Sequence, residues 1–122
     1  MIVTSVMEVH YLSVDQFKAL RRFVDKLTRE NLWIYVLRLL QEGPKQDSEI
    51  RDTMNRRFGF EPTGVTSHTI LYKMVRDGLV EVKKGNKKSD QRHYEITSDG
   101  ERAMQSAKVI LTNLIKNAFD LT

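Results

Sequence analysis

The stretch from Gly78 to Gly100 reads GLVEVKKGNKKSDQRHYEITSDG, and it decides the fold predicted for this chain. Apolar and polar residues alternate in residues 79–82 and again in residues 94–96, and a Gly-Asn pair among lysines separates the two segments. Alternation on both sides of a Gly-Asn turn predicts a β-hairpin. A helical pattern ends at Gly78 and another begins near Ser98, which gives the order helix, basic hairpin, helix. That order is typical of a winged helix, in which the hairpin is the wing.

Working outward from the hairpin, apolar residues recur at three- and four-residue steps, which predicts amphipathic helices. One helix is expected over residues 14–27 with Ser13 as its cap, one after Thr28 up to Gly43-Pro44, one from about residue 47 to 58, and one over residues 66–77. We therefore expect a single, mainly α domain over residues 1–122. The winged-helix core would span about 28–97, and helices at 13–27 and 98–121 would flank it.

Composition and charge limit the class of protein. Hydrophobic residues make up 40% and charged residues 30% of the 122 positions, cysteine is absent, and no apolar run approaches the roughly 20 residues of a membrane-spanning helix. The first residues lack the pattern of a signal peptide, so we expect a cytoplasmic, nucleoid-associated protein. Between Lys83 and Arg92 five basic residues and one acid give +4, which equals the net charge of the whole chain. The excess positive charge thus falls on the predicted wing.

The helix before the wing has an outward face of short polar and basic side chains, which is what a DNA recognition helix needs. The alternative interpretation of this face is that it is simply exposed to solvent. The alternative interpretation of the wing lysines is that they protect an edge hairpin from aggregation. The hypothesis of binding to double-stranded DNA assigns the contacts to both elements. The predicted DNA-binding residues are Thr66, Ser67, His68, Thr69, Tyr72, Lys73 and Arg76 on the helix, and Lys83, Lys84, Lys87, Lys88 and Arg92 on the wing.

The last predicted helix carries an apolar seam that is wider than one neighbouring helix requires. Such a stripe on a terminal helix must be covered. The helix at 14–27 is one candidate cover, and a second copy of the chain is the other, so we expect a homodimer. Its predicted interface consists of Met104, Ala107, Leu111, Leu114, Ile115, Ala118 and Leu121.

Catalysis and metal binding have no positive signal. The three histidines are scattered without carboxylates at metal-ligand spacing, and no Gly-rich phosphate loop or nucleophile motif occurs. We therefore expect no enzyme activity, no metal and no cofactor. Tyr11, Trp33 and Tyr35 are interpreted as core or interface aromatics rather than as a ligand pocket, and the sequence identifies no small-molecule effector.

Several of these motifs together resemble PadR-type winged-helix transcriptional regulators. They are residues 39–44 (LLQEGP), Phe58-Gly59, Gly78-Leu79-Val80 and residues 92–100 (RHYEITSDG). The last motif also recurs in the related MarR group, and the size and the flanking helices are similar to the small archaeal Lrs-like winged-helix regulators. The resemblance covers roughly residues 30–105.

The resemblance implies a dimer whose two recognition helices enter successive major grooves, with transcription control as the outcome. The chain departs from the family pattern in the recognition helix, where residues 65–69 (VTSHT) replace a usual glycine–threonine–leucine–tyrosine–proline run and only Thr66 matches. We predict a sequence-specific regulator that acts as a homodimer. The alternatives are a weakly specific architectural DNA binder and a winged helix that binds another protein.

Overall fold

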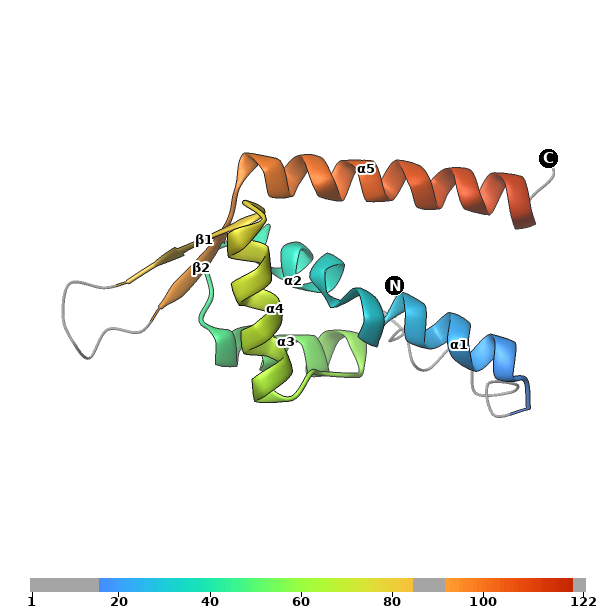
Figure 1. Cartoon of the computed structure of the whole chain (residues 1–122), viewed down its shortest axis with the longest axis horizontal. Coiled ribbons are helices and arrows are strands. Elements are labelled where there is room, and N and C mark those ends of the chain that lie inside the picture. The colour runs from blue at the N-terminus through green and yellow to red at the C-terminus, as the bar shows by residue number, and fades with distance from the viewer. Residues whose placement is uncertain (1–15, 85–91, 120–122) are drawn as a thin grey trace.

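The structure is a computed structural model that describes residues 16–84 and 92–119, and it is mainly helical (Figure 1). Among the described residues, four helical elements come before the helix that leads into the hairpin, and a long helix follows the hairpin. In order they are α1 (Lys18–Leu27), the 3₁₀ helix η1 (Arg29–Asn31), α2 (Leu32–Leu40), α3 (Asp47–Phe58), α4 (Gly64–Arg76), β1 (Val80–Lys83), β2 (His93–Ile96), α5 (Ser98–Leu114) and the π-type turn η2 (Ile115–Phe119). The predicted fold class, a winged helix with an added helix at each end, is confirmed.

The hydrophobic core is built around α2. This helix packs against α3, α4, α5 and β2, so it is apolar on most of its circumference, and Leu37 and Leu39 are fully buried. Tyr35 contacts the rings of Phe58 and Phe60 edge to face, with centroid distances of 5.0 Å in both pairs. Tyr35 is therefore a core aromatic, as predicted from the sequence.

The wing is a two-stranded antiparallel sheet in which Val80 pairs with Ile96 and Val82 with Tyr94. Because side chains alternate across a strand, these four residues share one face, and Val80 and Tyr94 are buried against the helices. Lys45 pairs with the other edge of β2: its N–H donates to the Tyr94 carbonyl over 3.1 Å and its carbonyl accepts from the Tyr94 N–H over 2.8 Å. β2 is thus held on both edges.

The turn from β2 into α5 explains the motif that ends at Gly100. Thr97 caps α5: its hydroxyl oxygen accepts from the Gly100 N–H over 3.0 Å and its hydroxyl donates to the Gly78 carbonyl over 2.6 Å. A Cβ added at Gly100 would lie only 2.4 Å from the Leu79 carbonyl oxygen and 2.7 Å from Ile96 Cγ1. Only glycine therefore lets the first turn of α5 lie this close to the start of β1.

Helix boundaries differ from the predicted ones by a few residues. α1 begins at Lys18 rather than at residue 14, and the predicted cap Ser13 lies outside the described residues. α3 begins at Asp47 with Gln46 as its N-cap, and the Glu49 carboxylate accepts from the Gln46 N–H over 3.0 Å. Gly59 ends α3 with a φ of 82°, in the left-handed region that glycine adopts without strain.

Within residues 16–84 and 92–119, no helix is both long and apolar enough to cross a lipid bilayer.

Candidate nucleic-acid interface

α4 and the hairpin form one end of the molecule. α4 packs against α3 and β1, and the two strands project beyond the helices beside it (Figure 1). Thr63 caps α4, since its hydroxyl oxygen accepts from the Thr66 N–H over 3.2 Å. The inward face of α4 contributes Leu71 and Met74 to the core, which turns the opposite face outward.

The outward face of α4 is polar and basic, as the sequence predicted. Tyr72 is 63% exposed, and no acidic residue occurs anywhere in the helix. The exposed predicted contact residues on α4 are Thr66, His68, Thr69, Tyr72, Lys73 and Arg76. A cationic helix face without a carboxylate is electrostatically suited to an anionic partner.

Ser67 corrects the sequence-based prediction, because it does not belong to this face. Its side chain is buried, with 3% exposed, and its hydroxyl donates to Asp47 Oδ1 at the start of α3. The helical period places residue 67 with Leu71 and Met74 rather than with His68 and Tyr72. Ser67 therefore joins α4 to α3, and the prediction that it lies on the outward face is corrected.

Val65 is a residue that the sequence analysis did not select. It is the second residue of α4 and is 80% exposed, more than any other large hydrophobic side chain among the described residues. The sequence feature that could have identified Val65 is its position two residues after the Thr63 cap. In helix-turn-helix proteins the first turn of the recognition helix is the part that contacts base edges.

The start of α4 differs electrostatically from the starts of α3 and α5 and resembles those of α1 and α2 in having no acid in its first turn. The first turn of α4 contains no acid, whereas the first turns of α3 and α5 each contain two. Acids in a first turn neutralise the partial positive charge at a helix N-terminus. The start of α4 leaves that partial charge uncompensated, and its basic side chains Lys73 and Arg76 lie at the other end of the helix.

The described part of the wing adds exposed cations, one of which is already paired. Lys83 Nζ lies 2.7 Å from Glu95 Oε2 on the neighbouring strand, and this hydrogen bond raises the pKa of Lys83 above its ordinary value. Lys84 and Arg92 are exposed, and the predicted contact residues Lys87 and Lys88 lie outside the described residues. Near the end of α3, Arg57 pairs with Glu42, which lowers the pKa of the Glu42 carboxyl.

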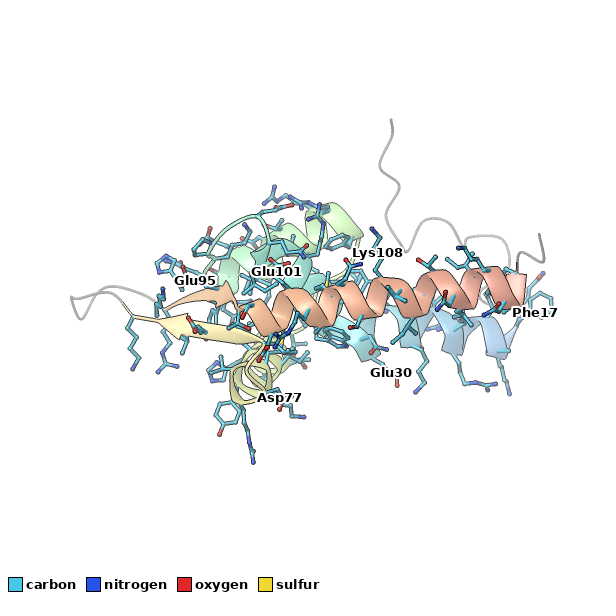
Figure 2. The ribbon with its side chains drawn as sticks, turned by 90° about the horizontal axis from the view of Figure 1, so that it is seen from above. Phe17, Glu30, Asp77, Glu95, Glu101 and Lys108 are labelled. Carbon is cyan, nitrogen blue, oxygen red and sulfur yellow. The ribbon has the colours of Figure 1, made fainter. Side chains whose placement is uncertain are left out.

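The far half of α5 carries the second exposed feature, an apolar face. The helix runs over α2 and on towards the beginning of α1 (Figure 1). In Figure 2 it is seen from above, from Glu101 near its start past Lys108 to the end above Phe17. Of the predicted interface residues, Met104 packs against the core and Ala107 is half-buried, whereas Leu121 lies outside the described residues. The exposed large apolar residues on this half are Val109, Ile110, Leu111, Leu114, Ile115 and Phe119, and the predicted Ala118 is exposed among them.

α1 does not cover this face. α5 packs against α2 and β2, and α1 is not among the elements that pack closely on it. α1 itself exposes Phe17 and Phe23. The expectation that the helix at 14–27 would cover part of the seam within one chain is therefore not met.

Two cavities border these features. One, of about 500 Å³, lies between α2, α4 and α5, with Trp33, Met74 and Lys73 in its lining. The other, of about 530 Å³, runs between α2 and α5, with Ile34, Met104 and Leu111 in its lining. In the part of the chain that the structure describes, no three His, Cys, Asp or Glu side chains gather as metal ligands do.

Solved structures share this fold. A PadR family transcriptional regulator from Eggerthella lenta DSM 2243 is similar with a TM-score of 0.71 at 20% identity, over 85% of this chain and 92% of that chain. A PadR family transcription regulator from Clostridium difficile R20291 is similar with a TM-score of 0.62 at 20% identity, over 71% and 95%. Bacillus subtilis PadR in complex with operator DNA is similar with a TM-score of 0.59 at 17% identity, over 64% and 45%.

The sequence comparison points to the same group. No curated protein sequence matches this chain. Residues 36–106, which run from the middle of α2 through the wing into α5, match the transcriptional regulator PadR-like family. That segment is more than half of the 122 residues and contains the whole helix–helix–wing unit. The chain therefore belongs to the PadR-like family of transcriptional regulators.

Proposed function

We propose that this protein is a sequence-specific DNA-binding regulator of transcription that acts as a homodimer. In this proposal α4 enters the major groove, and the wing contacts the backbone or an adjacent minor groove. The observation that carries the proposal is the exposed, acid-free face of α4 with His68, Lys73 and Arg76 beside a basic wing. Cations supply salt-dependent affinity for phosphates, and the helix face supplies sequence preference.

The family and one structural relative support the DNA partner. The chain belongs to a family of transcriptional regulators. Bacillus subtilis PadR, whose fold is similar, has been solved in complex with operator DNA. The open N-terminus of α4 is suited to the same task, because free backbone N–H groups and an uncompensated helix dipole favour a phosphate.

The exposed half of α5 supports the proposed dimer. Six large apolar side chains lie on it between residues 109 and 119, and the cavity between α2 and α5 continues that surface. Exposed apolar area of this extent on a helix favours association. A second copy offers the same α5 face together with Phe17 and Phe23 of α1, so a two-fold pairing covers both sets at once. The two α4 helices would then address half-sites about one helical turn, or 34 Å, apart.

The DNA proposal is tested by fluorescence anisotropy. One duplex carries the DNA that flanks the protein's own gene, and a scrambled duplex of equal length is the comparison; both are titrated over a salt series. We expect tighter binding to the flanking duplex and a steep salt slope. Equal binding to both would favour the weakly specific architectural role, and no binding at low salt would contradict DNA binding and favour a protein partner.

Variants connect the binding to α4. Lys73→Ala with Arg76→Ala removes two cations from the face, and the matched control Lys26→Ala with Arg102→Ala removes two exposed cations from α1 and α5. The first pair should weaken binding at least tenfold and reduce the salt slope by about two, since each lost phosphate contact contributes about one. An equal loss in the control pair would mean that net charge, rather than α4, sets the affinity.

The dimer is tested separately by sedimentation velocity. Leu111→Glu with Ile115→Glu places carboxylates in the exposed apolar face and should give a monomer. Because both side chains are exposed in one chain, the fold itself should remain, as circular dichroism can check. A wild-type monomer at micromolar concentration would contradict the dimer without affecting the DNA experiment.

A further inference from the structure

The outward face of α4 contains an apolar stripe within its polar surroundings. Val65 is 80% exposed and Tyr72 is 63% exposed. Thr69 lies between them, so the three positions follow steps of four and three residues along one side of the helix. In the proposed complex α4 faces the major groove, so these exposed apolar groups are placed to contact apolar groups on the bases.

Near the start of α4 the Ser67 and Thr69 hydroxyls donate within the protein, whereas the Thr66 hydroxyl oxygen only accepts. The Thr66 hydroxyl oxygen accepts from the Thr63 hydroxyl over 3.0 Å. The Ser67 hydroxyl donates to Asp47, and the Thr69 hydroxyl donates to the Val65 carbonyl over 3.0 Å. With its hydroxyl turned to the backbone, the exposed Thr69 presents its γ-methyl group.

From these contacts we propose that Val65 and Thr69 recognise thymine through its C5-methyl group, an inference that rests on the proposed binding of α4 in the major groove. The thymine methyl is the apolar group on the base edges of that groove, and aliphatic side chains and the threonine methyl are known to contact it. Val65 and Thr69 are specificity residues in this arrangement, whereas Lys73 and Arg76 hold the backbone. At positions 67 and 69 the hydroxyl donors are used within the protein, so at position 69 apolar reading takes the place of reading by a hydroxyl donor.

The first experiment changes the DNA alone. Binding sites are selected from a random duplex library at physiological salt, and every thymine in the selected half-site is then replaced singly by deoxyuridine, which lacks only the methyl group. We expect one or two thymines per half-site at which the replacement weakens binding about fourfold, the factor that corresponds to one buried methyl-sized group.

The second experiment changes the protein. Thr69→Ser deletes the γ-methyl and keeps the hydroxyl that donates to the Val65 carbonyl, whereas Thr69→Val keeps a methyl and deletes the hydroxyl. Thr69→Ser should lose about fourfold on the thymine duplex, and Thr69→Val should bind as the wild type. The opposite order would show that the hydroxyl reads the base and would overturn the inference.

Val65 is tested by a double-mutant cycle with the same bases. Val65→Ala should bind the thymine duplex more weakly than the wild type does. On the deoxyuridine duplex Val65→Ala and the wild type should bind equally, because the missing methyl group has already removed the contact that the mutation removes. Val109→Ala, an exposed valine on α5, is the matched control and should bind both duplexes as the wild type. Additive losses for Val65→Ala would overturn the inference.

The two proposals fail in different ways. The selection could yield a specific, salt-sensitive binding site whose affinity is unchanged by deoxyuridine at every position. That result would overturn thymine recognition and leave sequence-specific DNA binding intact. A library from which no sequence is enriched would contradict the proposed function and the inference with it.

Discussion

Two threonine-capped helix starts in this protein have the same local chemistry and opposite surroundings. Thr63 accepts from the N–H three residues on and begins α4, and Thr97 does the same for α5. At α5 the next contacts are internal: Thr97 also donates to the Gly78 carbonyl, and Gly100 is buried against Leu79 and Ile96. At α4 the cap is exposed and Val65 projects from the surface.

One local motif thus serves the fold at α5 and, in the proposed function, a partner at α4. The first turn of α5 carries two acids that neutralise its dipole, and the first turn of α4 carries none. The start of α5 is packed at Gly100 and compensated by its two acids, which makes it less suited to an anion. The start of α4 has no acid in its first turn, and the N–H groups that the Thr63 cap does not use favour an anion.

The sharpest way to break the comparison is to add one methyl group at each start. Gly100→Ala would place a Cβ 2.4 Å from the Leu79 carbonyl oxygen, so we expect a loss of about 3 kcal/mol in the free energy of unfolding. Gly64→Ala meets nothing closer than Arg51 Nη1 at 3.8 Å and should stabilise the fold by up to about 1 kcal/mol, because alanine costs less backbone entropy than glycine. Urea unfolding at a fixed protein concentration measures both.

Equal effects at the two glycines would mean that α5 is free to move away from β1. That result would contradict the close approach that distinguishes the two starts.

Removing the caps themselves should give a smaller contrast. Thr63→Ala loses one capping hydrogen bond at an exposed site and should cost about 1 kcal/mol. Thr97→Ala also leaves the Gly78 carbonyl without its hydroxyl donor, so we expect about 2 kcal/mol. Thermal unfolding followed by circular dichroism would rank the two variants, and the reverse ranking would be inconsistent with a buried junction at α5.

Much of this contrast was predictable from the sequence. The hairpin, the helix after it and the Thr97–Gly100 start follow from local patterns of alternation, capping and turn residues, which act over a few positions. The basic face of α4 followed from its helical period, because residues four apart share a side.

What the sequence could not predict depends on contacts between distant residues. Ser67 was assigned to the outer face as a short polar residue near the helix start, although the helical period places it with Leu71 and Met74. Its partner on the inner face, Asp47, lies twenty positions earlier and could not be predicted from the local pattern. Val65 was not selected because the predicted contact residues were chosen for polar and basic side chains. The sequence also could not predict which element packs on the apolar face of α5, because an apolar seam identifies the face and not its partner.

Ser67 provides the next prediction, because it is the one buried polar side chain of α4. Ser67→Ala removes the hydrogen bond to Asp47 and should cost about 1 kcal/mol in unfolding free energy. The Ser67→Ala protein should prefer the same DNA sequences as the wild type, since the side chain of residue 67 faces α3. A changed sequence preference with unchanged stability would return Ser67 to the outer face and contradict its burial.

The smallest expected change in stability is also the most informative about function. Thr66→Glu would give α4 a carboxylate at the third residue after the Thr63 cap, where it can accept from the cap N–H as Glu49 does in α3, and we expect a gain of about 0.5 kcal/mol. The same carboxylate would repel phosphates, so affinity for DNA should fall at least tenfold. Glu101→Gln at the start of α5 is the matched reverse change: it should cost about 0.5 kcal/mol and leave DNA affinity unchanged. A Thr66→Glu protein that is more stable and still binds DNA like the wild type would mean that the open start of α4 does not face DNA, and the comparison between the two helix starts would lose its functional meaning.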